Sequence, residues 1–125
     1  MERAAAEPGG ILADGTHEPR ACDAALARAF GFLGKRWNGV ILGVLLDGPA
    51  TFGQLRRAVG GISDSVLSDR LSELTGVGLV ARTVDEGPPV GVTYRLTAAG
   101  AALSPALAEL ATWAAANLPA EAPPG

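Results

Sequence analysis

The sequence has very little cysteine and histidine. Among 125 residues, Cys22 is the single cysteine and His17 the single histidine. One cysteine excludes a disulfide within the chain, and one residue of each type is too few for a structural zinc site. We therefore expect no metal and no cofactor, and nothing in the cysteine count points to secretion.

Long apolar runs and aromatic residues are also scarce. The apolar stretch from Val40 to Leu46 is much shorter than the roughly 20 residues that cross a bilayer. The N-terminus lacks a basic region followed by an apolar one, which a signal peptide would need. Only 5% of the residues are aromatic, which favours helices packed through aliphatic side chains over an all-β sandwich. We expect a cytoplasmic protein without a membrane segment.

A net positive charge is missing as well. The formal net charge is −3, which is unusual for a protein that binds nucleic acid. The charges are unevenly distributed, however, because residues 28–95 hold eight basic and six acidic side chains. The acidic excess lies at the two ends, so a surface for nucleic acid is expected in the middle of the chain.

The length allows one compact domain. Residues 1–21 combine several glycines and prolines without apolar periodicity and are predicted to form a flexible arm. Residues 119–125 have the same character and are predicted to form a disordered tail. The folded domain is expected to span residues 22–118.

Apolar periodicity and capping residues predict a mainly helical domain with a small β-hairpin, an α+β fold. Thr97 is expected to cap a final helix of about 20 residues, since a Ser or Thr hydroxyl is a favoured N-cap. The other expected elements are a helix capped by Asp23 and ended by Gly34, a buried helix over residues 37–46, a brief strand at 50–51, a helix over 52–59, a break at 60–63, a helix capped by Ser63, and strands at 79–84 and 92–96.

This order of elements is typical of a winged helix-turn-helix protein. The helix after the break has Leu67, Leu71 and Leu74 on one face, which leaves its polar face free to enter a major groove. For each arginine in this region, the alternative to a DNA contact is a solvated charge or an ion pair with a nearby carboxylate. The predicted DNA-contacting residues are Arg57, Ser63, Asp64, Ser65, Ser68, Asp69, Arg70, Ser72, Arg82 and Arg95.

Several phrases resemble the HxlR-type winged-helix regulators over about residues 24–118. They are GKRW, GPATFGQL, GGISDSVLSDRLSEL, GLVAR and PPVGVTYRLTAAG, in one unbroken order. The resemblance implies a bacterial transcriptional regulator, such as a repressor, that binds double-stranded operator DNA. It also implies a homodimer assembled through the N-terminal and C-terminal helices.

The chain departs from this family at three places. Asp64 and Ser65 stand where many relatives have proline and a basic residue, and Gly91 occupies a wing position that is often arginine. Relatives that sense oxidants use a cysteine shortly before the first helix. That position falls on Ala24 here, whereas Cys22 lies two residues earlier, so Cys22 is either a redox sensor or an unreactive residue at a helix start.

The last helix indicates how the chain assembles. Its apolar stripe would leave a large apolar surface exposed on so small a monomer, which a two-fold dimer would bury. The predicted interface residues are Leu26, Phe30, Leu103, Leu107, Leu110 and Trp113. A small-molecule effector could bind between these helices and the DNA-binding core, with Phe30, Phe32, Trp37 and Trp113 as candidate walls.

Two other classes of function are less well supported by the sequence. An enzyme is disfavoured because no segment combines a nucleophile, a base and an orienting group. A winged helix that binds protein partners instead of DNA is the main alternative, since the net charge is negative and the wing tip holds few cations. Dependence of binding on salt separates this alternative from a DNA-binding protein.

Overall fold

The computed structural model describes residues 20, 21 and 23–120. The chain divides into two units, Met1–Lys35 and Arg36–Gly125, and each is described by itself. The predicted N-terminal arm and the end of the predicted tail lie mostly outside the described residues, so these predictions stay open.

The first unit contains helix α1 (Ala24–Leu33). Its start is fixed by Asp23, whose carboxylate accepts a hydrogen bond from the Leu26 amide at 2.8 Å. At its other end, the Gly34 amide donates to the Phe30 carbonyl at 2.7 Å. Both predicted ends of this helix are therefore confirmed. None of its residues is buried within the described chain.

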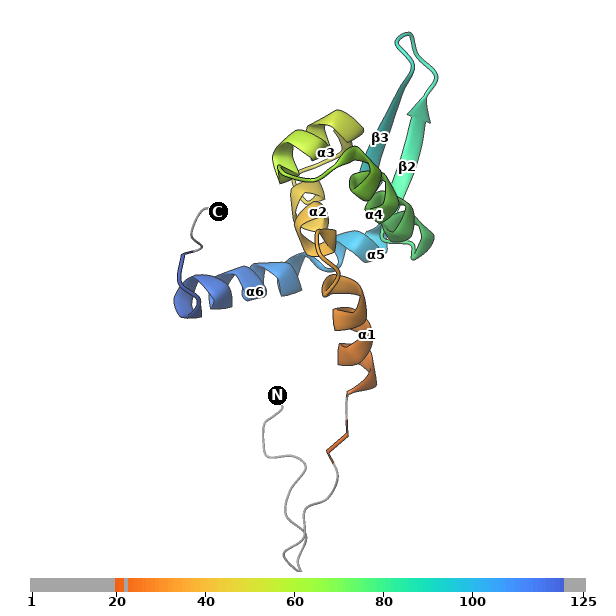
Figure 1. Cartoon of the computed structure of the whole chain (residues 1–125). Helices are drawn as coiled ribbons and strands as arrows, with labels where there is room; N and C mark the ends of the chain where they lie inside the picture. The colour runs from red at the N-terminus through yellow and green to blue at the C-terminus, as the bar shows by residue number, and fades with distance from the viewer. Residues whose placement is uncertain (1–19, 22, 121–125) are drawn as a thin grey trace, which may run out of the picture. The chain divides into compact units, whose positions relative to one another are not determined.

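The second unit holds the remaining elements (Figure 1). Their core is aliphatic, and it centres on Leu42 of α2, Leu55 of α3 and Leu67 of α4. None of the helices among the described residues is long and apolar enough to cross a membrane. In chain order the elements are α2 (Asn38–Leu45), β1 (Ala50–Thr51), α3 (Phe52–Val59), α4 (Asp64–Gly76), β2 (Val80–Asp85), β3 (Gly91–Leu96), α5 (Ala98–Ala101) and α6 (Ser104–Asn117).

Helix α2 is buried along one side only. Ile41, Leu42 and Leu45 are at most 2% exposed, whereas Val40 is 53% exposed. The prediction of a buried helix is therefore correct for one face of α2 only. The reason is that α2 packs against α3 and β3, and Val40 projects away from them.

Local capping explains the helix-turn-helix pair, α3 and α4. The Thr51 hydroxyl accepts from the Gln54 amide at 3.1 Å, and the Gln54 side chain accepts from the Thr51 amide at 2.8 Å. Ser63 caps α4 in the predicted way, accepting from the Val66 amide at 3.2 Å. Between the helices, Gly60 and Gly61 have φ angles of 70° and 75°, where a side chain would be strained. The predicted break at 60–63 is confirmed.

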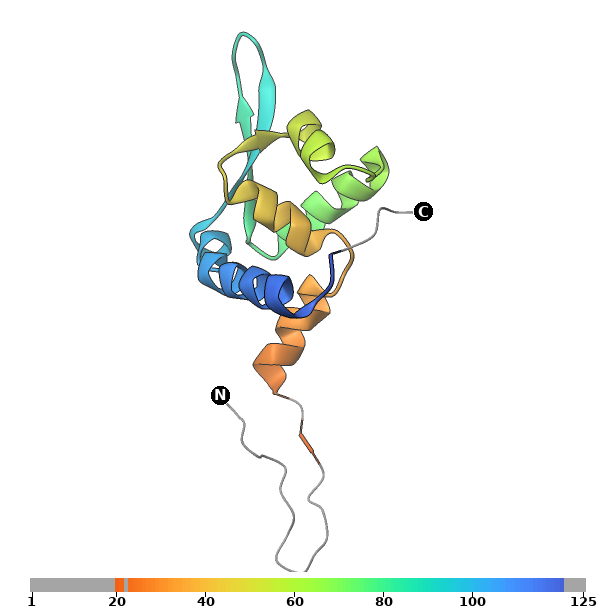
Figure 2. The same ribbon diagram turned by 90° about the vertical axis from the view of Figure 1, so that its left-hand side faces the viewer.

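The wing is part of a three-stranded antiparallel sheet with the strand order β1-β3-β2. Register pairs Arg82 with Tyr94 across β2 and β3, and Tyr94 with Ala50 of β1. The hairpin and the brief strand were predicted, but not the pairing between them. Beyond β1 the hairpin continues as two strands alone and projects past α3 (Figure 2). These elements together form a winged helix-turn-helix fold.

The prediction of one long final helix is wrong. The structure contains two helices, α5 and α6, with a turn at Ala102 and Leu103 between them. Thr97 caps α5 as expected, accepting from the Gly100 amide at 3.1 Å. Pro105 causes the interruption, because it has no amide proton to continue the hydrogen bonding of α5 but is well tolerated in the first turn of a new helix.

Candidate DNA-binding surface

The outer face of α4 is polar and exposed. Leu67, Leu71 and Leu74 are at most 2% exposed and hold the opposite face in the core. The outer face therefore points to solvent without cost to the packing, as a recognition helix requires. Its exposed polar residues are Ser65, Ser68, Asp69 and Ser72.

Ser63 and Asp64, at the start of α4, have partners within the protein. Besides capping the helix, the Ser63 hydroxyl lies 3.4 Å from that of Ser65. The Asp64 carboxylate accepts from a guanidinium nitrogen of Arg56 in α3, at 2.9 Å and 3.1 Å to its two oxygens. Arg56 was not among the predicted residues, and no local pattern in the sequence singled it out.

Arg70 is largely withdrawn from solvent. Its side chain is 17% exposed and pairs with Asp69 at 2.8 Å and with Glu73 at 2.5 Å. The hydrogen bond to Asp69 and the negative charge of Glu73 raise the pKa of the guanidinium above its usual value. The alternative of an ion pair therefore describes Arg70 in this structure, and its predicted contact with DNA stays a prediction.

Three other arginines from the predicted set remain available for a contact with DNA. Arg57 in α3, Arg82 in β2 and Arg95 in β3 are exposed and form no ion pair within residues 20, 21 and 23–120. Strand register separates two of them, since Arg82 is paired with Tyr94 whereas Arg95 is paired with Ala81. Successive side chains alternate between the faces of a strand, so Arg82 and Arg95 lie on opposite faces of the hairpin.

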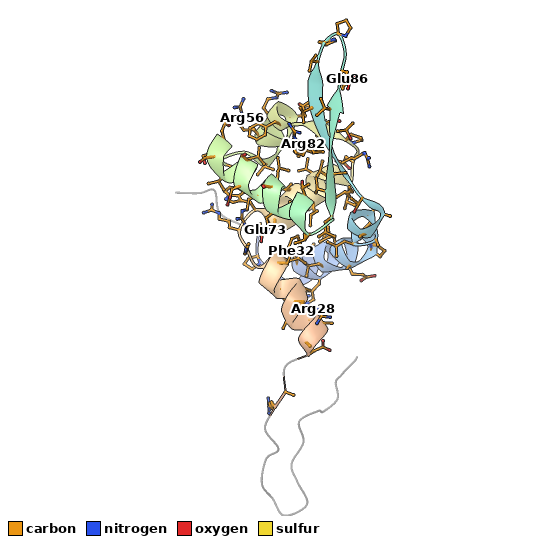
Figure 3. All side chains as sticks on the ribbon, turned by 90° about the vertical axis from the view of Figure 1, so that its right-hand side faces the viewer. Arg28, Phe32, Arg56, Glu73, Arg82 and Glu86 are labelled. Carbon is orange, nitrogen blue, oxygen red and sulfur yellow. The ribbon has the colours of Figure 1, made fainter. Side chains whose placement is uncertain are left out.

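A cleft of about 380 Å³ lies between α4 and the hairpin. Figure 3 labels Arg82 at this position, beside α4. The cleft brings Ser68 and Ser72 of α4 together with Arg82 of β2, and adds Tyr94, which was not among the predicted residues. Counting strand register outward from the turn at residues 86–90 would have placed Tyr94 opposite Arg82. The lining residues are Ser68, Leu71, Ser72, Thr75, Gly76, Arg82 and Tyr94.

The tip of the wing is acidic and apolar. Asp85 and Glu86 are exposed, and Val90 is 74% exposed. Glu86 lies near the end of the hairpin, well beyond Arg82 (Figure 3). Among the hairpin residues the positive charges are therefore confined to Arg82 and Arg95, away from the tip.

Exposed apolar side chains mark α1 and α6. In α1, Leu26 is 56% and Phe30 57% exposed, and in α6, Leu110 is 47% and Trp113 52% exposed. Leu103 and Leu107 are half-buried. These are the residues predicted to form a dimer interface, and their exposure in the single chain leaves that prediction open.

The predicted effector pocket and redox sensor also stay open. Phe30 and Phe32 belong to the first unit, whereas Trp37 and Trp113 belong to the second. Trp37 is half-buried, with the Arg36 guanidinium carbon 4.5 Å from its ring centre. Cys22 lies outside the described residues.

Comparison with known proteins decides the family. The family model described as HxlR-like helix-turn-helix matches residues 32–122. The chain belongs to the HxlR family. A relative, the HTH-type transcriptional regulator YodB from Bacillus subtilis, is 44% identical over 86 residues, which cover 69% of this chain and 77% of YodB.

Solved structures agree with this placement in the HxlR family. The reduced form of YodB from B. subtilis matches with a TM-score of 0.73 and 37% identity, covering 82% of this chain and all of that one. The redox regulator HypR in its oxidised form matches with a TM-score of 0.71 and 28% identity, covering 77% of this chain and 99% of that one. This member of the HxlR family is therefore a transcriptional regulator of the helix-turn-helix type.

Proposed function

We propose that this protein is a cytoplasmic homodimer that binds double-stranded operator DNA with sequence specificity and so regulates transcription. The observation that carries the proposal is the exposed polar face of α4, set beside a hairpin whose Arg82 has no ion-pair partner in the described chain. Serine hydroxyls can donate to or accept from bases and phosphates, and arginines pair with phosphates. In this proposal α4 enters the major groove and Arg57, Arg82 and Arg95 contact the backbone.

The dimer is supported by the apolar side chains of α1 and α6. Phe30 and Trp113 are both more than half exposed, which is costly for aromatic residues in a monomer. A two-fold axis through these helices would bury them and present two copies of α4 to two half-sites one helical turn apart. Dimerisation also doubles the number of phosphate contacts, which offsets the small number of cations on each subunit.

Footprinting on the DNA flanking the protein's own gene tests this function. A protected segment with two-fold symmetry is the expected result. Titration of that segment at several salt concentrations should then give a log-log slope of about −5, as for roughly six phosphate contacts. No protected segment, or binding that ignores salt, would instead favour the protein-interaction alternative suggested by the acidic wing tip.

A response to oxidants or to a small molecule is a second candidate, favoured by the similarity to HypR, which is described as a redox regulator. Cys22 is the single thiol of the chain and hence the one place for cysteine oxidation. Footprinting with and without diamide, on the wild type and on Cys22→Ser, tests this response. A change in protection that disappears in Cys22→Ser supports the redox reading, and protection that diamide leaves unchanged contradicts it.

A further inference from the structure

We infer that the cleft between α4 and the hairpin holds one phosphate of the DNA backbone and that Tyr94 is a contact residue of this site. The inference rests on the proposed DNA binding and assigns one subsite within it. Three features carry it: the register of the hairpin, the charge of the lining and the unused hydrogen-bonding groups.

Register brings the two hairpin residues together. Arg82 and Tyr94 are directly paired across β2 and β3, so their side chains share one face of the hairpin. Both line the cleft, which places that face toward α4. From α4, Ser68, Ser72 and Thr75 are spaced by four and three residues and therefore follow one side of the helix. The cleft thus has one wall from each element.

The lining has a single sign of charge. Arg82 is its one ionised residue, and no carboxylate is among the seven residues that line it. Arg70 and Arg56 offer a contrast, because each is already paired with a carboxylate. A guanidinium with no counter-ion in the described chain is a favourable partner for an anion, and the phosphodiester is the anion that a DNA-binding face meets.

Neutral hydroxyl donors line the same cleft as Arg82. The hydroxyls of Ser68, Ser72 and Tyr94 form no side-chain hydrogen bond within the part of the chain that the structure describes. Thr75 differs, since its hydroxyl already donates to the Leu71 carbonyl at 2.7 Å. Three hydroxyls and one guanidinium are therefore free to donate to phosphate oxygens, which accept several hydrogen bonds at once.

The volume is adequate for more than the phosphate alone. At about 380 Å³ the cleft is comparable to pockets that hold small organic ligands. The half-buried ring of Tyr94 and the side chain of Leu71 supply apolar surface on which the adjoining sugar can rest. A phosphate held here would contact both the recognition helix and the base of the wing, and so would fix the direction in which α4 enters the groove.

Two variants and one change in the DNA test the site. Arg82→Gln and Tyr94→Phe, made in the full chain, should each weaken binding to the footprinted duplex, by about tenfold and about threefold respectively. The log-log salt slope of Arg82→Gln should become shallower by about two, one phosphate from each subunit of the dimer. Each phosphate of a half-site is then replaced in turn by an uncharged methylphosphonate.

At one position per half-site, the methylphosphonate should weaken binding of the wild-type protein. With that modified duplex, neither Arg82→Gln nor Tyr94→Phe should weaken binding any further, because the phosphate that they contact is already neutral. Arg95→Gln removes one positive charge from the opposite face of the hairpin. Its loss of affinity should therefore still be measured with the duplex that carries the methylphosphonate at that position. If the protein binds the duplex but no single methylphosphonate position abolishes the effects of both variants, the inference is wrong while DNA binding stands. If the protein binds no duplex, the phosphate site and the proposed DNA binding are both wrong.

Competition with a free anion is the last test of the site. Inorganic phosphate, added at constant ionic strength, should not displace the duplex at millimolar concentration, because a phosphodiester gains its affinity from the rest of the DNA. Displacement by inorganic phosphate that is lost in Arg82→Gln, without a shared methylphosphonate position, would identify the cleft as a site for small anions and overturn its assignment to the DNA backbone.

Discussion

Arg56 of α3 and Asp64 of α4 form an ion pair that bridges the two helices of the helix-turn-helix motif, with a shortest distance of 2.9 Å. Their side chains are 47% and 64% exposed, so solvent screening keeps the contribution of the pair to stability small. Its main consequence is that the Asp64 carboxylate offsets the positive charge of Arg56 at the start of α4. Asp64 also lies in the first turn of α4, where the helix dipole favours a negative charge.

Asp64→Asn should therefore strengthen DNA binding, by about threefold to tenfold, because it removes a negative charge from the end of α4 that we propose to face DNA and releases Arg56 for a phosphate. The free energy of unfolding should fall by less than about 1 kcal/mol. Binding titrations and urea unfolding measure the two effects. Asp47→Asn, which removes a carboxylate between α2 and β1, serves as the matched control, and an equal gain from it would contradict this explanation.

Gly91→Arg should add a phosphate contact on the wing. A Cβ at this position meets nothing within 4 Å, so the strand can accept a side chain without rearrangement. We expect higher affinity and a log-log salt slope steeper by about two for a dimer. Gly91→Gln controls for the bulk of the side chain. A slope that is the same for both variants would show that this part of the hairpin lies away from the DNA.

Trp113→Asp should separate the subunits of the proposed homodimer. A two-fold interface contains the substituted side chain twice, and loss of a central aromatic residue costs about 2 kcal/mol or more each time. The dissociation constant of the dimer should therefore rise about a thousandfold. Sedimentation velocity measures it, with Thr112→Asp on a neighbouring face of α6 as the control. An intact dimer in Trp113→Asp would place the interface elsewhere.

Gly61→Ala should destabilise the protein by about 1–2 kcal/mol, because its φ of 75° is unfavourable for any residue with a Cβ. Gly43→Ala provides the comparison within α2, where a Cβ meets nothing within 4 Å and alanine should stabilise the helix by about 0.5–1 kcal/mol. Urea unfolding at one protein concentration measures both. Equal effects from the two variants would show that backbone conformation at Gly61 is not the cause.

The features that the sequence predicted well depend on contacts between near neighbours. Asp23, Ser63 and Thr97 each cap a helix by accepting from an amide three residues ahead, so residue type and position were sufficient. The interruption before α6 was missed because the apolar spacing continues through Pro105. A proline at that position fits both a helix start and an irregular turn, and only the hydrogen bonds of the two segments distinguish them.

The candidate site was predicted less completely, since it depends on choices among competing partners. Arg70 has carboxylates one residue before it and three residues after it, and the sequence could not show whether these or DNA would be preferred. Tyr94 was missed because its proximity to Ser68 and Ser72 arises from sheet register and from the packing of α4 on β2. Neither is a local property of the chain.

Strand β1 contains only two residues, yet it pairs with β3 immediately before α3 begins. The base of the hairpin is thereby joined to the helix-turn-helix motif, whereas its far end is free of neighbouring elements (Figure 1). A slight rotation of α3 would consequently displace the far end through a larger distance. A fluorescent probe attached at residue 86 could thus follow, in real time and without labelling the duplex, how the motif reorients as it docks.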